Sequence, residues 1–517
     1  MTAPEPLLPA PQERSTRYGQ LRDRVLSDPD WGRAVRWLAP LVITAVAAVL
    51  RLVNVGHPHQ LAFDETYYVK DAWSLWTLGY EGTWGEKADD AFVTLQALPL
   101  SDQGAFIVHP PLGKWLIALG MAIGGPDNSA GWRLATAVLG TGSVLLVYLI
   151  ARRLSGSIVV ATVAGTLLAI DGLSIVMSRI ALLDGILTFF LLLGVLFVLI
   201  DRERTIPVLE RRDPDAPDPF WGPVLWRRPW LIAAGTAFGA ASAVKWSGLY
   251  ALAGFGLYVV VTDALARRRA GVVLWPTAAA FRQGPVSFVL FVFPALAVYL
   301  FSWTGWLVTA GGYDRQSDPN PLVALWKYHE SMLGFHVGLT RGHPYASPAW
   351  EWPLLLRPTA VWVDSDPKNC GTDHCIAVIS AVPNPLIWYG GVAAAVYLLY
   401  RLVRGWITRR PIGPELTLPL VGLAVTYLPW LMFPERTIFQ FYTVVMMPFL
   451  VLGLSMTLRI IAGRREDPLY RRQSGERTVT IFLVFVVLVS AFFLPLWTGM
   501  SVPYDFWLLH NWMPGWV

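Results

Sequence analysis

Residues 57–73 read HPHQLAFDETYYVKDAW, a polar, aromatic and acidic stretch that directly follows the first long apolar segment of the chain. Its two adjacent carboxylates, Asp64 and Glu65, stand roughly ten residues beyond that segment, among phenylalanine, tyrosine and tryptophan side chains. The segments before and after this stretch are dominated by apolar runs. The chain is therefore interpreted as an apolar scaffold that holds these two acids in place.

The composition is that of a membrane protein with several spans. Of 517 residues, 54% are hydrophobic and only 15% are charged, and the mean hydropathy is +0.46. Ordinary soluble enzymes are much less apolar, and here long apolar runs recur along the whole chain. The formal charge of +5 does not indicate nucleic-acid binding, because arginines between apolar runs are what membrane orientation produces.

Residues 1–36 are expected to form a cytoplasmic N-terminal tail. They are polar and contain prolines, with no apolar region before a small-residue cleavage site, so no cleavable signal peptide is predicted. Arginines before the first span place this end in the cytoplasm by the positive-inside rule. These arginines are Arg14, Arg17, Arg22, Arg24, Arg33 and Arg36.

The apolar runs predict an all-α polytopic membrane protein with about eleven transmembrane helices. The spans are expected at about residues 37–54, 133–150, 158–176, 183–200, 230–245, 249–261, 286–306, 386–402, 416–433, 439–458 and 478–497. Arginine clusters fall on the predicted inner segments, whereas all six lysines fall on predicted outer segments or outer helix ends. This layout places the C-terminus outside.

Two outer segments divide the predicted chain. The first, residues 55–131, belongs to an N-terminal transmembrane module over residues 37–306, and its run PPLGKWLIALGMAIGG is expected to be an interfacial helix because it is short for a span. The second is a large outer loop over residues 307–385. A C-terminal transmembrane module (386–497) and an outer tail (498–517) follow. The Pro-rich inner linker, residues 202–228, is expected not to continue a helix.

Asp64 and Glu65 are the first candidates for chemistry. A carboxylate near apolar and aromatic surface loses solvation, so its pKa rises and it suits a general base. Adjacent acidic pairs are also common in solvated loops, and spacing alone favours that interpretation; Asp71 is expected to be solvated. His109 and Lys114, at the ends of the turn HPPLGK, suit either substrate positioning or a proline-started helix with a snorkelling lysine.

A second group of candidates consists of four basic residues near outer helix ends, Arg133, Arg179, Lys245 and Arg436. Ionisable groups at membrane depth are costly, so they line polar cavities or pair with partners. A lipid phosphate would be such a partner, and arginine grips phosphate through two N–H groups. The alternatives are pairs of Arg179 with Asp184 and of Arg436 with Glu435, whereas Lys245 has no acid close in sequence.

The large outer loop contains the run HPYASPAWEWPLLLRP at residues 343–358, with His343, Tyr345 and Trp350. It suits a folded lid or acceptor groove, or an aromatic belt at the interface. Its dense prolines favour a fixed loop. Further on, Cys370 and Cys375 are expected to form a disulfide; a metal site with His374 is the weaker alternative, because two cysteines and one histidine do not complete a zinc site.

Taken in order, five motifs resemble the protein O-mannosyltransferases, the glycosyltransferase family 39 enzymes of the GT-C class. The motifs are FDETYY (63–68), HPPLGK (109–114), SRIALLD (178–184), KWSGLY (245–250) and HPYASPAWEWPLLLRP (343–358). Each is modest alone, but the ordered set spans most of the membrane core. The chain has no room for the β-trefoil MIR domain of the eukaryotic members, so it resembles the bacterial branch.

The resemblance implies a GT-C fold and transfer of mannose from polyprenyl-phosphate mannose to Ser or Thr hydroxyls of exported proteins, on the outer face of the plasma membrane. It implies that Asp64 is the catalytic base, with Glu65 in a supporting role, and that transfer inverts the anomeric carbon. Arg133, Lys245 and Arg436 are candidates for the donor phosphate. Substrate positioning is expected of His109, Lys114, Arg179, Asp184, His343, Tyr345 and Trp350.

Two other functions compete with this one. A GT-C enzyme with a cell-envelope glycan or lipid as acceptor differs only in its acceptor, and the 343–358 motif disfavours it. A non-catalytic transporter or lipid flippase would place its site near the bilayer midplane, often within repeated halves, and the sequence shows neither feature. No ligand set demands a divalent metal ion, and a role for the protein export machinery as partner stays open.

Overall fold

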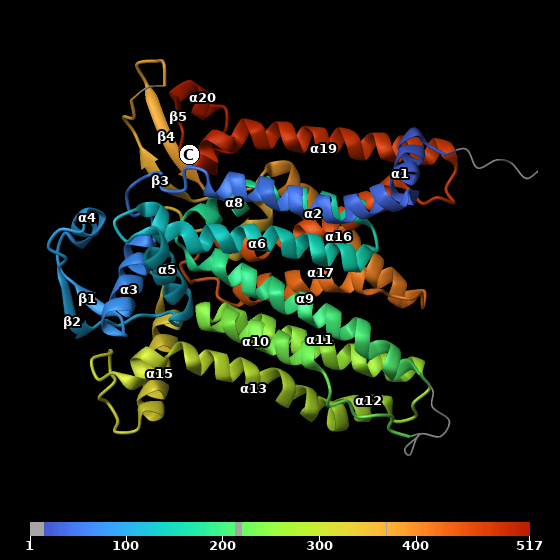
Figure 1. Ribbon diagram of the computed structural model, residues 1–517, viewed down its shortest axis with the longest axis horizontal. Helices are drawn as coiled ribbons and strands as arrows, with labels where there is room; N and C mark the ends of the chain where they lie inside the picture. The colour runs from blue at the N-terminus through green and yellow to red at the C-terminus, as the bar shows by residue number, and fades with distance from the viewer. Residues whose placement is uncertain (1–14, 212–219, 369, 517) are drawn as a thin grey trace, which may run out of the picture.

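The computed structural model describes residues 15–211, 220–368 and 370–516. Long helices lie side by side along one axis of the molecule, and smaller elements gather at both ends (Figure 1). We call the end with α3 (Glu65–Leu78) and α15 (Pro321–Gly338) the α3 end, and the end with α1 (Arg17–Ser27) the α1 end. Residues 1–14 of the predicted tail, 212–219 of the predicted linker and residue 517 lie outside the described residues.

Helices build most of the molecule, as the sequence predicts. The long ones are α2 (Pro29–Leu52), α6 (Ser129–Ser155), α9 (Leu183–Glu210), α10 (Pro229–Val244), α11 (Ser247–Arg269), α13 (Gly284–Ser302), α16 (Pro385–Ile407), α17 (Pro414–Tyr427), α18 (Met447–Ala462) and α19 (Leu469–Thr498). Shorter helices are α4 (Ala88–Thr94), α5 (Leu112–Gly124), α7 (Ile158–Ala169), α8 (Gly172–Arg179), α12 (Trp275–Thr277), η1 (Ala278–Gln283), α14 (Thr304–Val308), η2 (Ala349–Leu354), η3 (Leu428–Met432), η4 (Gln440–Val445), α20 (Tyr504–Leu508) and η5 (Pro514–Trp516).

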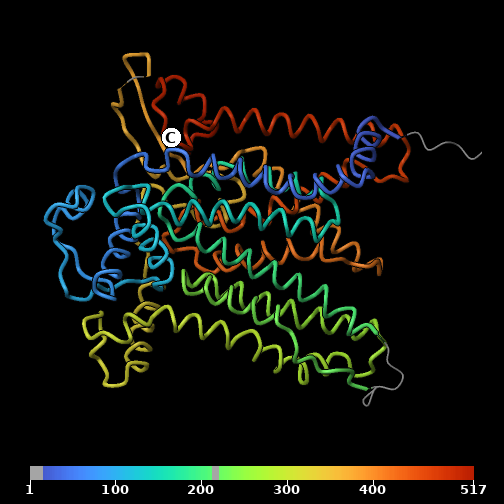
Figure 2. Tube along the Cα trace, viewed as in Figure 1, coloured from blue at the N-terminus to red at the C-terminus, as the bar shows by residue number. Residues whose placement is uncertain are grey.

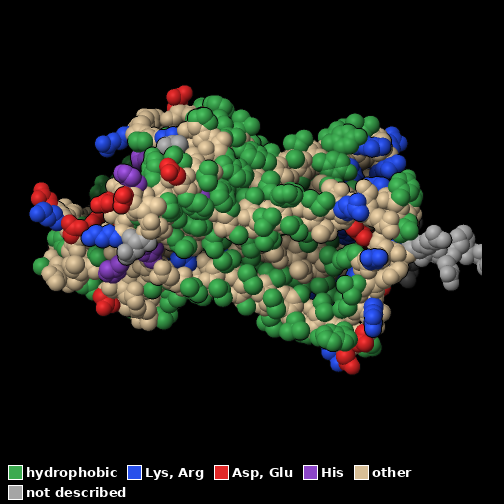
Figure 3. Space-filling view, turned by 90° about the horizontal axis from the view of Figure 1, so that it is seen from above, with side chains coloured by type: hydrophobic (Ala, Val, Ile, Leu, Met, Phe, Trp, Pro, Cys, Tyr) green, Lys and Arg blue, Asp and Glu red, His purple; other side chains and the backbone are tan. Residues whose placement is uncertain are grey.

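The chain is a multi-pass membrane protein. Among the described residues, eight helices are long and apolar enough to cross a membrane, or nine spans if the bent pair of α7 and α8 counts as one. Helices α10 and α18 are apolar but shorter. Together they coincide with the eleven predicted segments, although the number of spans stays a prediction. In Figure 3 an apolar belt separates two ends where charged side chains gather.

Five short strands, which the sequence did not predict, lie in the predicted outer segments. Strands β1 (Gly82–Trp84) and β2 (Leu100–Gly104) pair antiparallel. Strands β3 (Ala360–Asp364), β4 (Cys375–Ser380) and β5 (Ser501–Pro503) form an antiparallel sheet in that order. Because β5 belongs to the C-terminal tail, the tail and the large loop share the α3 end, whereas α1 lies at the other end (Figure 2).

The bent span of α7 and α8 turns by 57°. Asp171 caps α8 by accepting the Ser174 N–H at 2.9 Å. The break frees carbonyls at the end of α7, and the buried Arg51 of α2 donates to those of Leu168 and Ala169 at 3.2 and 3.1 Å. A helix break within a membrane is tolerated when such groups are bonded again. Arg51 therefore fixes the direction in which α8 leaves the bundle.

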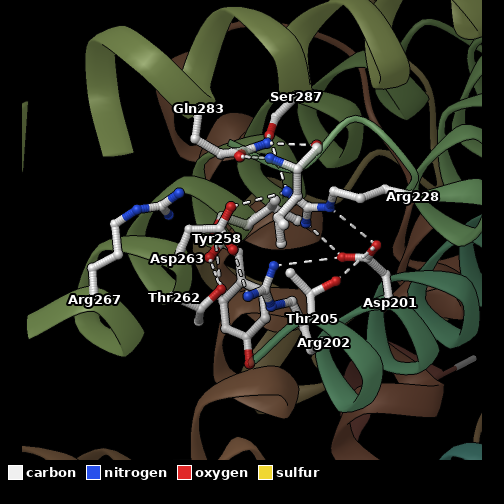
Figure 4. A network of polar contacts seen from close by, with 12 residues as sticks. Asp201, Arg202, Thr205, Arg228, Tyr258, Thr262, Asp263, Arg267, Gln283 and Ser287 are labelled. Carbon is white, nitrogen blue, oxygen red and sulfur yellow. Dashed lines mark hydrogen bonds and ion pairs between the residues drawn. The ribbon is translucent and has the colours of Figure 1, made fainter. Parts of the chain in front are cut away.

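At the α1 end, a buried ion-pair network joins α9, α10 and α11 (Figure 4). Arg228 donates to Asp201 at 3.2 and 2.6 Å and to Asp263 at 2.9 Å, and Arg202 also pairs with Asp263. The prediction that the chain leaves its helix at residue 202 is wrong, because α9 continues to Glu210. The network buries Asp201 and Arg202 against the neighbouring helices, so these turns stay helical.

Candidate active site

Asp64 stands at the start of α3, at the α3 end of the bundle. Phe63, which precedes Asp64, has a positive φ of 51°. The backbone turns at this residue, and α3 begins directly afterwards. The Asp64 carbonyl accepts the N–H groups of Tyr67 and Tyr68 at 3.0 and 3.1 Å, which starts the first helical turn. Its carboxylate is partly buried and accepts no hydrogen bond from the described residues. The side chain is therefore left available for a ligand.

The neighbouring Glu65 is the opposite case, because it is fully buried and fully bonded. Its carboxylate accepts two N–H groups of Arg133 on α6, at 2.8 and 2.7 Å. It also accepts the backbone N–H of Ala62 at 2.8 Å and that of Ala181 at 2.7 Å. Two carboxylate oxygens offer about four acceptor positions, so Glu65 has none left. Glu65 is a positioning residue that ties the Asp64 turn to α6 and to the segment after α8.

Arg133 does not present a free N–H to a phosphate. Besides Glu65, it donates to the carbonyls of Val55, Pro58 and Gln60 at 3.2, 2.8 and 2.9 Å. A guanidinium has five N–H donors, and all five are used here by Glu65 and this loop. The expectation that Arg133 binds the donor phosphate therefore needs correction: it shapes the loop that precedes Asp64.

Arg179 is also bonded to backbone, and its predicted pair with Asp184 is wrong. Its guanidinium donates to the carbonyls of Leu50, Val53 and Asn54 at 3.0, 2.8 and 2.9 Å. The last carbonyls of a helix have no partner within that helix, and these close the C-terminal end of α2. Arg179 thus anchors the start of the segment that leads to Asp64.

Asp184 pairs instead with Lys245, at 2.9 and 3.1 Å, although 61 residues separate them. Asp184 begins α9, and Lys245 lies between α10 and α11. The Lys245 ammonium also lies over the ring of Tyr442, 4.0 Å from its centroid. Lys245 has no acid close by in the sequence, and the structure supplies one from another span.

Asp64 lies close enough to this pair for their charges to act on it. Burial raises the pKa of Asp64 to about 6, with the Lys245 charge lowering it and the Asp184 charge raising it. At neutral pH the group is mostly ionised, yet its basicity exceeds that of a solvated aspartate. A partly buried carboxylate of this kind has the properties of a general base.

Arg436, like Arg179, has no carboxylate partner among the described residues. One of its terminal nitrogens donates to His336 Nδ1 at 2.9 Å, and the guanidinium lies over the Trp430 ring. His336 Nε2 lies 2.8 Å from the Val108 carbonyl. Burial lowers the pKa of His336 to about 4, so the neutral ring donates from Nε2 and accepts at Nδ1. Arg436 Nε is buried without a partner in the described structure.

His109 and Lys114 lie beside this centre but differ in what they offer. His109 is partly buried next to the rings of Tyr68 and His336, and burial lowers its pKa well below the ordinary value. Lys114 is fully buried, and it pairs with Glu81 and donates to the His109 carbonyl at 3.0 Å. Lys114 therefore holds the HPPLGK turn, which corrects its expected contact with substrate.

Asp71 is buried, so the expectation that it is solvated is wrong. Burial raises its pKa to about 7, and Lys114 and Glu81 are the charges that act on it most strongly. Asp71 lies on α3, which packs against α5, the helix that carries Lys114. The polar residues around Asp71 in the sequence do not indicate this packing.

The 343–358 run forms part of the rim and a short helix, η2. The His343 ring packs against Phe63, which precedes Asp64, and against Phe439, with centroids 6.0 and 5.0 Å apart. Tyr345 packs on His343, whereas Trp350 is 59% exposed. The run therefore lies next to Asp64 through His343.

Cys370 and Cys375 are joined in a disulfide before and at the start of β4. No group of three or more His, Cys, Asp or Glu side chains is arranged to hold a metal ion within the ranges that the structure describes.

An apolar cavity of about 480 Å³ lies beside the centre, between α10, α11, α13 and α15. Trp246 follows Lys245 directly and forms one wall, and its ring also packs against His336. Tyr299 and His329 are among its polar lining residues, with Ser242 and Glu330, and they bond to each other at 2.6 Å. Leu252 and Leu296 line its apolar part. The cavity thus reaches from the charged centre toward the membrane-spanning helices.

Sequence reasoning missed Tyr442, His336 and Glu81. Tyr442 and His336 complete the surroundings of Lys245 and Arg436 from segments far along the chain, and Glu81 neutralises Lys114. None lies within a recognised motif. One sequence signal could have indicated Glu81: Lys114 at membrane depth requires a counter-charge. No sequence signal indicated Tyr442 or His336.

The chain matches known proteins over most of its length. Residues 100–309 match the family model "Dolichyl-phosphate-mannose-protein mannosyltransferase", and residues 321–516 match "C-terminal four TMM region of protein-O-mannosyltransferase". A polyprenol-phosphate-mannose–protein mannosyltransferase of Mycolicibacterium smegmatis is 34% identical over 525 aligned positions, covering 95% of this chain and 96% of the relative. The corresponding Mycobacterium tuberculosis protein is 33% identical, covering 93% and 92%.

The fold agrees with these matches. A chain of the Saccharomyces cerevisiae Pmt1–Pmt2 protein O-mannosyltransferase complex bound to the sugar donor superposes with a TM-score of 0.71, at 15% identity, covering 93% of this chain and 92% of that one. The predicted GT-C fold class and the family resemblance are both confirmed. The chain belongs to the protein O-mannosyltransferase family.

Proposed function

We propose that this enzyme transfers mannose from polyprenyl-phosphate mannose to Ser or Thr hydroxyls of exported proteins, with Asp64 as the general base and inversion at the anomeric carbon. The observation that carries the proposal is the contrast between two adjacent acids. Glu65 has no acceptor position left, whereas the Asp64 carboxylate is partly buried, free of hydrogen bonds from the described residues and has a pKa raised to about 6.

The lipid donor is supported by the apolar cavity next to the charged centre. A polyprenyl chain needs an apolar path that begins at a phosphate site, and the 480 Å³ cavity begins at Trp246, beside Lys245. The curated relatives are named for polyprenol-phosphate mannose. A donor placed this way has its phosphate near Lys245 and Arg436 and its sugar toward Asp64.

In the reaction, the acceptor hydroxyl oxygen attacks the anomeric carbon as the bond from that carbon to the phosphate oxygen breaks. The hydroxyl proton passes to the Asp64 carboxylate, and the polyprenyl phosphate leaves with the bonding electrons. One displacement without a covalent intermediate inverts the anomeric centre. Glu65 takes no part in the proton transfer, because its role is to hold the Asp64 turn.

Charge that develops on the leaving phosphate needs a cation, and Arg436 is best suited. Its guanidinium has no carboxylate partner in the described structure and keeps Nε free of protein hydrogen bonds. Lys245 is second, because Asp184 already accepts from it. Preorganised cations act most strongly where charge appears in the transition state.

The outer face of the plasma membrane is the proposed location of this site. The strands and the elements that carry or adjoin the lysines lie at the α3 end, whereas the arginine clusters follow the opposite ends of α11, α16 and α18. This distribution follows the positive-inside rule. Acceptors would then be polypeptides after export.

The test uses membranes that contain the wild type, Asp64→Asn or Asp102→Asn at matched expression. They are incubated with polyprenyl-phosphate mannose carrying a radiolabel on the sugar and with an exported Ser/Thr-rich peptide. Asp102 is an exposed acid at the same end of the molecule and is the control. We expect Asp64→Asn to lower peptide labelling at least about 100-fold and Asp102→Asn to leave it unchanged.

Two results would overturn parts of the proposal. Equal labelling by Asp64→Asn and the wild type refutes the base assignment. Labelling of envelope glycan and never of peptide by the wild type refutes the protein acceptor. A peptide with alanine at every Ser and Thr position should receive no label, and label in that peptide refutes hydroxyl transfer.

A further inference from the structure

A second and larger cavity, about 1090 Å³ in volume, lies at the α1 end, far from the candidate active site. Helices α1, α6, α7, α16, α17, α18 and α19 and the turns next to them form its wall. Seven arginines and three glutamates line it, an excess of four positive charges. In Figure 3, blue side chains gather at this end of the molecule. The cavity is therefore suited to an anion.

Most of these arginines have no carboxylate partner among the described residues; Arg22 and Arg465 both pair with Asp23. Arg401 and Arg404 each donate one terminal N–H to a tyrosine hydroxyl of their own helix, at 3.2 and 3.4 Å. Arg459 donates one terminal N–H to the Ser155 carbonyl at 2.7 Å. None of the three forms an ion pair with a described residue. Each guanidinium therefore keeps several N–H groups for another ligand.

The buried network at the same end behaves differently. There, two aspartates neutralise Arg202 and Arg228 (Figure 4). That arrangement connects α9, α10 and α11. The cavity, in contrast, combines open volume with guanidinium groups that no carboxylate of the described residues neutralises. The positive-inside rule concerns only the charge of loops. It does not explain why arginines from separate helices line the same cavity.

The cavity has apolar walls as well as a charged rim. Val160, Leu398 and Met456, all buried in the bundle, line its inner part. On the adjoining outer face of α16, Val396 and Leu399 are exposed, as membrane-facing residues are. A site with cations at its mouth and apolar walls within fits an amphiphile that carries a phosphate.

We propose that this cavity binds the headgroup of an anionic phosphate-bearing membrane lipid, in the leaflet at the α1 end. All the cations of the cavity are arginines, although the chain has six lysines elsewhere. Arginine holds phosphate oxygens through two parallel N–H bonds, which lysine does not. Basic pockets between transmembrane helices bind such headgroups in other membrane proteins. The proposal does not rest on mannosyl transfer.

The test measures lipid binding by the full-length protein, purified in a neutral detergent. The probes are dioctanoyl phosphatidylglycerol, dioctanoyl phosphatidylcholine and inorganic phosphate. The cavity variant combines Arg401→Gln, Arg404→Gln and Arg459→Gln. The control combines Arg227→Gln, Arg268→Gln and Arg269→Gln, which removes the same charge at the same end but outside the cavity. A third protein carries lysine at the three cavity positions.

We expect saturable binding of phosphatidylglycerol to the wild type and to the control. The dissociation constant for phosphatidylglycerol should rise about tenfold or more in the glutamine variant of the cavity. The lysine variant should have a dissociation constant between those of the wild type and the glutamine variant, because it keeps the charge but loses the paired N–H bonds. Equal affinity of the cavity and control variants would refute the site. Inorganic phosphate binding as tightly as phosphatidylglycerol would refute a lipid and indicate a soluble anion. Equal binding of phosphatidylcholine would refute the requirement for net negative charge.

Discussion

Replacing Glu65 by glutamine and Asp64 by asparagine should have opposite effects on stability, although the two acids are adjacent. Glu65 accepts two N–H groups of Arg133 and two backbone N–H groups. A glutamine places an NH₂ against at least one of these donors and leaves Arg133 without its counter-charge. Breaking a buried ion pair by removing one partner costs about 3–5 kcal/mol. We expect Glu65→Gln to lower the unfolding temperature clearly.

Asp64→Asn should not destabilise the protein. The rise of the Asp64 pKa from 3.8 to about 6 means that holding this charge in the folded state costs up to about 3 kcal/mol at neutral pH. The sign follows because the folded state favours the protonated acid, so a neutral amide removes the cost. We expect an unchanged or higher unfolding temperature together with loss of transfer.

The assay pairs thermal unfolding of each purified variant with mannosyl transfer at matched protein concentration. Separate roles predict that Glu65→Gln loses stability and that its activity partly recovers at low temperature, whereas Asp64→Asn is stable and inactive at every temperature. A Glu65→Gln protein as stable as the wild type would refute its positioning role. An Asp64→Asn protein as unstable as Glu65→Gln would show that Asp64 is held by contacts that the structure does not contain.

Three further predictions concern the same site. Transfer should fall as the pH is lowered through about 6, because the ionised form of Asp64 is the active one. A pH–rate profile should show about a tenth of the plateau rate at pH 5. An unchanged rate at pH 5 would contradict the assignment of Asp64 as the base. Arg436→Gln should lower kcat about 100-fold or more, with Arg436→Lys recovering part of it; a change in KM alone would mean that Arg436 only binds donor. Leu296→Trp should fill part of the apolar cavity and raise KM for a long-chain donor more than for a short-chain one; equal effects would remove the lipid chain from this cavity.

The sequence predicted the scaffold well because apolar runs of membrane length have few alternative structures. All eleven expected segments coincide with helices, and the acidic stretch at residues 57–73 stands at the end of the bundle where the charged centre forms. The helix that continues to Glu210 was missed because its support is the ion pair of Asp201 with Arg228, 27 residues away.

The site was less predictable because its members are bonded to partners on distant segments. Lys245 looked unpaired until Asp184 of another span met it, and Arg133 looked available until the carbonyls of the 55–60 loop used its donors. Residue type and spacing identify groups that need a partner at membrane depth. They do not determine which partner the fold supplies, and therefore which cation remains for phosphate.

The four bonds of Glu65 also bear on how the protein is made. Three of these bonds come from α6 and from the segment after α8, and the fourth comes from Ala62 in the turn itself. Both α6 and that segment follow α3 along the chain, so until they have entered the membrane only contacts within residues 62–68 hold the turn that carries Asp64. We therefore expect competence for transfer to require completed insertion of the N-terminal half.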